Sequence, residues 1–145
     1  MTLEHKDRKA LSDVRIEKAQ EFIKDARANL AEERIKTSIN RSYYAALNAV
    51  RALLILEGVN PESHEGTVTM LSLRFVKPGL LPIDAIKKFK TLLSRRTDVD
   101  YGDFETVNAA DAKDSLKIAE EIIETIENVR LEMIRSAKSQ TVLPL

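Results

Sequence analysis

The residues best suited to chemistry lie between positions 89 and 101, in the stretch FKTLLSRRTDVDY. Three apolar residues in and before it recur at the spacing that places side chains on one face of an α-helix: Ile86, Phe89 and Leu93. The next two positions on that face are Arg96 and Asp100. Buried charges are tolerated only when they are paired. The spacing therefore predicts that Arg96 and Asp100 enter the core as a hydrogen-bonded pair, or that they lie at the mouth of a cleft.

Arg96 has the most useful chemistry on this face, because a guanidinium can form two parallel hydrogen bonds to a carboxylate or a phosphate. On an exposed helix, an Arg and an Asp four residues apart contribute about 0.2–0.5 kcal/mol, and Arg before Asp is the weaker order. Helix stabilisation is therefore a weak reason for this arrangement, and a role in a polar network is a better one.

A second polar face is expected on the helix that precedes this stretch. Its polar side chains recur at intervals of three, four and three residues: Arg41, Tyr44, Asn48 and Arg51. An apolar face runs beside it through Ile39, Tyr43, Ala46, Val50 and Leu53. A charged face is usually only solvated, but the tyrosine and the asparagine indicate that this one borders a groove or a partner. The four polar residues, together with Arg95 from the basic run at 87–96, are candidates for binding a nucleotide or RNA.

Neither a metal-binding motif nor a cofactor motif is present in the sequence. The histidines are His5, near the N-terminus, and His64, and neither has the spacing of a known metal-ligand motif. The sequence favours a hydrogen-bonding role at a helix start for His64. Phosphate loops, dinucleotide-binding motifs and nucleophile elbows are also absent. We therefore expect no metal and no cofactor.

Composition indicates a folded, helical protein. Hydrophobic residues make up 43% of the 145 and charged residues 32%, which is typical of a globular chain and excludes a disordered one. Glycine and proline are rare, with four of each, so helix-forming residues dominate. The length fits one domain over residues 1–145, with its core at about residues 10–137. We expect an all-α fold.

Charge and cysteine content exclude several classes of protein and of binding site. The 23 basic and 23 acidic residues give a net charge of zero, which excludes a strongly basic protein that coats nucleic acid but is compatible with a local basic patch. The absence of cysteine excludes disulfides and thiolate metal sites. The N-terminus is too charged for a signal peptide, and no apolar run approaches the ~20 residues of a membrane span. We expect a cytoplasmic protein without a membrane segment.

Hydrophobic spacing and helix-end residues predict three helices before the Arg96 stretch. The first is expected at about residues 10–33, after a frayed polar segment, and the second at about 35–57 with Gly58 ending it. A third, shorter helix has Val68, Leu71, Leu73 and Phe75 as its apolar members. It must stop near Lys77, because Pro78 and Gly79 cannot continue it.

Two more helices are expected in the second half of the chain. Pro82 fits the first position of the helix that carries Arg96. Residues 102–107 read as a loop, after which Asn108 can cap a last helix that continues to about Ala137. Residues 140–145 are expected to form a tail that is disordered or docks on a partner.

Six short motifs, in order along residues 10–137, carry a resemblance to a known family. They are Asn40-Arg41-Ser42-Tyr43-Tyr44-Ala45, Ala52-Leu53-Leu54, Gly58, His64-Glu65-Gly66, Phe75-Val76 and Arg96-Thr97-Asp98-Val99-Asp100-Tyr101. Together they resemble HEPN-domain proteins of the branch with an Arg-x-x-x-Asp-Tyr signature. The resemblance implies an up-and-down bundle of four to five helices that forms a homodimer around a cleft. It also implies pairing with a minimal nucleotidyltransferase in bacterial or archaeal toxin–antitoxin modules.

Many HEPN proteins are metal-independent ribonucleases in which an arginine and a histidine that follows it meet at the dimer cleft. Arg96 matches that arginine, but Tyr101 stands where the histidine would be, and no histidine follows. A histidine, with a pKa of about 6.5, transfers protons near neutral pH, whereas a tyrosine ionises near pH 10. Tyr101 is therefore a poor general base but a reasonable hydrogen-bond donor to phosphate.

Three functions stay open on these grounds. The first is a nucleotide- or RNA-binding protein that acts with a nucleotidyltransferase in a toxin–antitoxin-like module. The second is a metal-independent ribonuclease toxin, in which Arg96 stabilises the charge of the transition state and Tyr101 or Asp100 positions the 2′-hydroxyl. Asp100, with a raised pKa, could accept its proton. In the third, these three residues only stabilise the core of a dimeric bundle.

Overall fold

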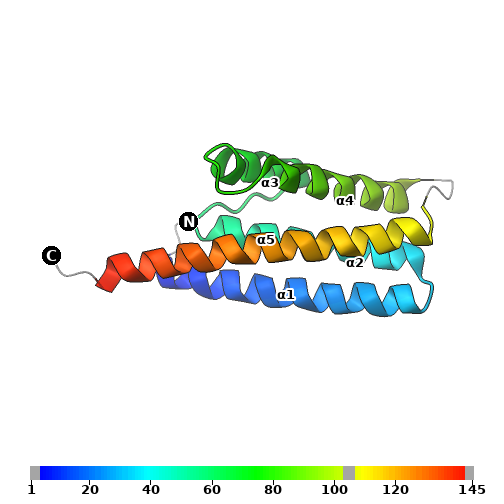
Figure 1. Ribbon diagram of the computed structural model, residues 1–145, viewed down its shortest axis with the longest axis horizontal. Helices are drawn as coiled ribbons and strands as arrows, with labels where there is room; N and C mark the ends of the chain where they lie inside the picture. The colour runs from blue at the N-terminus through cyan, green and yellow to red at the C-terminus, as the bar shows by residue number, and fades with distance from the viewer. Residues whose placement is uncertain (1–3, 103–106, 143–145) are drawn as a thin grey trace.

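Every regular element in the described part of the chain, residues 4–102 and 107–142 of the computed structural model, is a helix (Figure 1). In chain order these are α1 (His5–Ala31), α2 (Ile35–Ile55), α3 (His64–Leu71), the short π-helix η1 (Ser72–Val76), α4 (Ile83–Tyr101) and α5 (Ala109–Val142). No strand occurs among these described residues. The prediction of an all-α bundle is therefore confirmed.

The four long helices lie side by side and alternate in direction, as an up-and-down bundle requires (Figure 1). α2 packs against α1, α3, α4 and α5, and α5 also contacts α1 and α4. The short α3 lies at the end of the bundle where α4 begins, and the C-terminal end of α5 projects past the other helices. α2 is therefore the helix around which the others are arranged.

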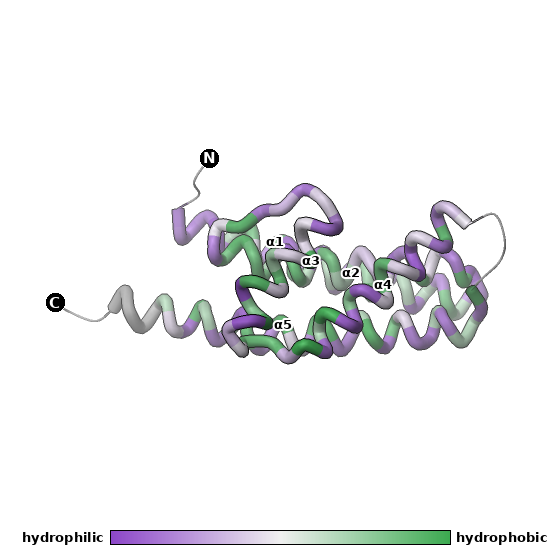
Figure 2. Tube along the Cα trace, turned by 90° about the horizontal axis from the view of Figure 1, so that it is seen from above, coloured by the Kyte–Doolittle hydropathy of each residue, from purple (hydrophilic) through white to green (hydrophobic). Residues whose placement is uncertain are grey.

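α2 can take this central position because small residues cover much of its surface. Its alanines at positions 45, 46, 49 and 52 are fully buried, which lets the neighbouring helices approach closely. Its larger core residues are also buried: Ile39, Tyr43, Val50 and Leu53. Hydrophobic and hydrophilic blocks alternate along the helices in Figure 2, which is the pattern of amphipathic helices that bury one face.

The first and last helices are longer than predicted. α1 begins at His5, so the prediction of a frayed segment before about residue 10 is wrong from His5 onward. A helical hydrogen bond already joins the Arg8 amide to the Glu4 carbonyl over 2.9 Å. α5 continues to Val142, because no glycine or proline interrupts it before Pro144. The remaining residues of the predicted tail, 143–145, and residues 103–106 of the predicted loop lie outside the described residues.

Most other helix ends follow the sequence signals. Gly58 follows α2 with a φ of 74°, a conformation that glycine adopts without a steric penalty. Asn108 and Asp111 exchange hydrogen bonds of 3.0 and 2.9 Å and so cap α5 reciprocally, as predicted. Pro82 is the N-cap of α4 and not its first helical residue, because its ψ of 152° is extended.

The third predicted helix is interrupted by η1. The Lys77 amide donates to the Ser72 carbonyl, five residues back, over 2.8 Å. This wider turn keeps Phe75 fully buried while Leu73, which was expected on the apolar face, is 48% exposed. Leu73, predicted as an apolar member of this helix, therefore does not share the buried face with Phe75.

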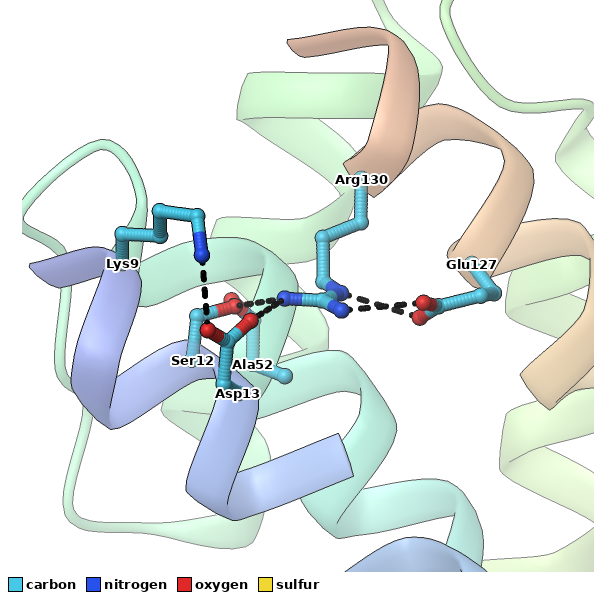
Figure 3. A network of polar contacts seen from close by, with 6 residues as sticks. All are labelled: Lys9, Ser12, Asp13, Ala52, Glu127 and Arg130. Carbon is cyan, nitrogen blue, oxygen red and sulfur yellow. Dashed lines mark hydrogen bonds and ion pairs between the residues drawn. The ribbon is translucent and has the colours of Figure 1, made fainter. Parts of the chain in front are cut away.

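One buried polar network joins the three helices α1, α2 and α5 (Figure 3). Arg130 of α5 is only 5% exposed and donates to Asp13 Oδ1 over 2.7 Å, to Ser12 Oγ over 3.2 Å and to both carboxylate oxygens of Glu127 over 2.9 Å. Ser12 in turn donates to the Ala52 carbonyl of α2 over 2.6 Å. Burial acts to lower the pKa of Arg130, but the hydrogen bonds and charges of Glu127 and Asp13 raise it overall. Arg130 is therefore a fully partnered structural cation.

Candidate functional site

The inner face of α4 brings Arg96 to the border between core and solvent. Phe89, two turns earlier, is fully buried, whereas the Arg96 side chain keeps an exposed fraction of 13%. Asp100, one turn later, places Oδ2 2.8 Å from Arg96 Nε, and its side chain is 27% exposed. The Nε–H does not point at that oxygen, so the contact is an ion pair and Nε has no hydrogen-bond acceptor among the described residues.

Three tyrosine rings surround the Arg96 guanidinium. Its central carbon lies 5.8 Å from the ring centroid of Tyr43, 5.7 Å from that of Tyr44 and 6.0 Å from that of Tyr101, all within the range of cation–π attraction. Arg96 Nη2 also donates to the Tyr44 hydroxyl over 3.1 Å. Burial acts to lower the pKa of Arg96, but Tyr44, Asp100 and Tyr101 raise it overall. The guanidinium is therefore permanently charged and held by aromatic faces more than by hydrogen bonds.

His64, the first residue of α3, joins the same group of side chains through Tyr43. Its Nδ1 forms a short hydrogen bond with the Tyr43 hydroxyl, and the two ring centroids are 5.5 Å apart. Burial raises the pKa of Tyr43 to about 12, so that the phenol stays protonated. Burial, followed by the positive charges of Arg96 and Arg51, lowers the pKa of His64. The imidazole is therefore neutral near pH 7.

The guanidinium of Arg51 acts on this histidine, and that of Arg15 lies near Arg51. Arg51 of α2 has a buried Nε without a hydrogen-bond partner, and no carboxylate among the described residues forms an ion pair with it. Arg15 of α1 donates to the Arg51 carbonyl over 3.3 Å and to Asn60 Oδ1 over 3.0 Å. Burial and the charge of Arg51 lower the pKa of Arg15. Positive charge thus exceeds negative charge at this place, although the chain as a whole is neutral.

We call this group of side chains, which comes from α2, α3 and α4, the Arg96 cluster. Its members are Tyr43, Tyr44, Arg51, His64, Arg96, Asp100 and Tyr101.

The structure brings only some of the predicted site residues into the Arg96 cluster. Tyr44 and Arg51, from the predicted binding face, lie in it, together with Arg96, Asp100 and the 73%-exposed Tyr101.

The other predicted binding residues have different surroundings. Arg41 donates to Asn40 Oδ1 over 2.6 Å and lies over the Phe22 ring. Asn48 donates to the Tyr44 carbonyl of its own helix over 2.8 Å. Arg95 points to α5, where it pairs with Asp114 over 2.8 Å.

Sequence reasoning did not assign His64 to the site. It expected a hydrogen-bonding role at a helix start, and His64 does begin α3, where Ser63 Oγ accepts from the Gly66 amide over 2.8 Å. The contact with Tyr43 joins two helices across 21 sequence positions, so no local spacing indicates it. A signal for Arg130 did exist, because it lies four residues after the buried Ile126 on the same helical face.

The Arg96 cluster can bind an anion and has a neutral imidazole beside it. A phosphate could accept from the guanidinium groups of Arg51 and Arg96 and from the tyrosine hydroxyls. Nothing in the described part of the chain gathers three His, Asp or Glu side chains that could hold a metal ion. The described helices also include none that is both long and apolar enough to cross a membrane.

Comparisons with known proteins agree on a fold and a family. Residues 12–129 match the HEPN domain. A UPF0332 protein of Thermotoga maritima is 29% identical over 119 residues, which cover 82% of this chain and 90% of that protein. The protein named "Putative toxin MJ0142" of Methanocaldococcus jannaschii is 27% identical over 86 residues, which cover 59% of this chain and 58% of that one.

A solved structure shares the architecture. The crystal structure of TT1696 from Thermus thermophilus superposes with a TM-score of 0.69 over 81% of this chain and 97% of that chain. The sequence identity is 18%, so this likeness shows the fold alone.

Proposed function

This chain belongs to the HEPN domain family, and from that membership and the Arg96 cluster we propose that it is a toxin–antitoxin-like HEPN protein that binds the phosphates of RNA or of a nucleotide. The family membership and the relative whose name contains the word toxin support the first part of this proposal. The unpaired positive charge of the Arg96 cluster supports the second.

One observation carries the phosphate-binding part. Buried polar nitrogens almost always have an acceptor in native proteins, yet Nε of Arg51 and Nε of Arg96 both lack one among the described residues. Among the described residues, the carboxylate of Asp100 pairs with Arg96, and no carboxylate pairs with Arg51. Phosphate oxygens are acceptors that match the guanidinium fork and would supply the missing negative charge.

The test is equilibrium binding of a short fluorescent single-stranded RNA, followed by anisotropy. Arg96→Ala should weaken binding about 10- to 100-fold, since a hydrogen bond to a charged group contributes roughly 1.5–3 kcal/mol. Arg96→Lys should restore it only partly, because an ammonium lacks the planar fork.

The matched control for this test is Arg27→Ala. It also removes one arginine and one ion pair, that with Glu120, but at an exposed position of α1, and it should bind like the wild type. Equal affinity of Arg96→Ala and the wild type would overturn the proposal. If Arg96→Ala lowers only the melting temperature and leaves binding unchanged, Arg96 has the purely structural role.

We propose a minimal nucleotidyltransferase as the protein partner and a homodimer as the form of this chain. Both follow from the HEPN resemblance, in which the two kinds of protein occur together in toxin–antitoxin modules. Coexpression with a nucleotidyltransferase encoded next to this gene should give a complex that survives size-exclusion chromatography with light scattering. Elution of this chain as a monomer, alone and in the mixture, would argue against both.

A second candidate function is metal-independent ribonuclease activity, and His64 favours it. The HEPN ribonucleases need a histidine near their arginine, and here an imidazole reaches the Arg96 cluster from an earlier helix. The same RNA, incubated with the protein in EDTA, should then give fragments with 2′,3′-cyclic phosphate ends, and Arg96→Ala should abolish them. Intact RNA after prolonged incubation would leave binding as the function.

A further inference from the structure

His64 has one ring nitrogen, Nε2, that forms no hydrogen bond with the other residues of the Arg96 cluster. Its Nδ1 is occupied by the Tyr43 hydroxyl, and the Tyr43 ring is fully buried, so the orientation of the imidazole is fixed. No described residue hydrogen-bonds to the other ring nitrogen, Nε2, and that atom is not among the buried polar atoms that lack a partner. Nε2 is therefore open to solvent on a half-buried ring.

The charges around His64 are those of a site for an anion. α2 presents Tyr43 and Arg51 to it, and α4 presents Arg96. Both of the charged groups that shift its pKa are cations. A negatively charged ligand is therefore the chemistry that would complement the free edge of the ring.

We propose that His64 is a second phosphate-contacting residue of the Arg96 cluster, with Nε2 reaching the same RNA phosphate that Arg96 binds. This inference rests on the proposed function and deepens it, because it makes His64 part of the ligand site and Tyr43 the residue that positions it. It also adds to that site a group whose charge changes near neutral pH.

Binding of the phosphate must then be linked to protonation. In the free protein burial, followed by the charges of Arg96 and Arg51, keeps the pKa of His64 low, so the imidazole is neutral. A bound phosphate lies beside the ring and raises this pKa, because it favours the charged form. RNA binding therefore takes up a proton, and the affinity rises as the pH falls from the pKa of the complex to that of the free protein.

The experiment measures RNA affinity from about pH 8 to about pH 5.5, a range in which histidine titrates. The wild type should bind more tightly as the pH falls. In His64→Gln an amide nitrogen takes the place of Nε2 but does not titrate, so this variant should bind with an affinity independent of pH. His64→Asn keeps an amide near the Nδ1 position, for Tyr43, but loses the distal group. It should bind about 3- to 10-fold more weakly than the wild type at low pH.

The control is His5→Gln, because His5 is the only other histidine of the chain. This variant should keep the pH dependence of the wild type. Calorimetric titration of the wild type in buffers of different ionisation enthalpy measures the proton uptake directly and needs no variant to fold.

The outcomes separate this inference from the function beneath it. If the wild type binds RNA, Arg96→Ala weakens binding and His64→Gln keeps the full pH dependence, the role of His64 is wrong and the proposed function stands. If the wild type binds RNA without proton uptake, the role of His64 is likewise wrong and the proposed function stands. If the wild type binds no RNA at any pH, both are overturned.

Discussion

Arg96 and Arg130 are both largely buried, but their partners differ in kind. Arg130 has acceptors for its side-chain nitrogens in Glu127, Asp13 and Ser12. Arg96 has one tyrosine hydroxyl and one misaligned carboxylate, and aromatic rings occupy the remaining space. A fully partnered arginine gains little from an added ligand, whereas an incompletely partnered one can still form strong hydrogen bonds. Arg130 is therefore a structural residue and Arg96 a candidate for binding.

Arg130→Ala should lower the free energy of unfolding by about 2–4 kcal/mol, since it leaves Asp13 and Glu127 without their partner and opens a gap between α1 and α5. Chemical denaturation followed by circular dichroism measures this. Arg135→Ala is the matched control on the same helix: Arg135 also pairs with a glutamate three residues before it, but its side chain is 74% exposed. It should change stability by less than about 0.5 kcal/mol. Equal effects of the two variants would contradict the structural role of Arg130.

At the scale of the elements, apolar spacing and end signals predicted the helices well, because both are local properties of the chain. Gly58 and Asn108 act on their own neighbours, and the signals at both positions hold. The π-turn before Lys77 could not be predicted, because it depends on how Phe75 fits the core built by other helices. The contact of His64 with Tyr43 was missed for the same reason. Spacing did place Arg96 and Asp100 together, because they lie on one helix.

Gly58→Ala should destabilise the junction after α2. The φ of 74° costs a non-glycine residue roughly 1–2 kcal/mol, and the added Cβ would lie 2.9 Å from the end of the flexible Arg8 side chain. Gly79→Ala is the control, because its φ of 89° brings the same strain and its Cβ would meet nothing within 4 Å. Thermal melts should show a loss for both variants and a slightly larger one for Gly58→Ala. A stabilised Gly58→Ala would contradict the expected strain at this position.

At the scale of the whole molecule, the net charge of zero affects RNA binding as much as the Arg96 cluster does. With 23 basic and 23 acidic residues the chain has no general attraction for nucleic acid. Affinity for RNA must then come from a few phosphate contacts at the Arg96 cluster. Such binding depends on salt only through those contacts.

The salt dependence of RNA binding should therefore be shallow. Each phosphate neutralised on a single strand contributes about −0.7 to the slope of log K against log salt, so the one phosphate that Arg51 and Arg96 share predicts a slope of about −0.7 at pH 8. Protonated His64 contacts the same phosphate, so the slope should stay at about −0.7 at pH 5.5. Arg96→Ala should make the slope shallower at either pH. A much steeper slope in the wild type would mean that RNA binds over a broad basic surface elsewhere.

The position of Arg130 also determines how far local unfolding of α5 can proceed. The C-terminal end of α5 projects beyond its neighbours (Figure 1), and we expect the helix to unfold from this end first. Among the side chains that the structure describes, Arg130 forms the ion pair between α5 and α1 that lies nearest to this end. This unfolding should stop at Arg130. A protease that removes the end of α5 should therefore leave a resistant core that still contains the ion pair of Arg130 with Asp13.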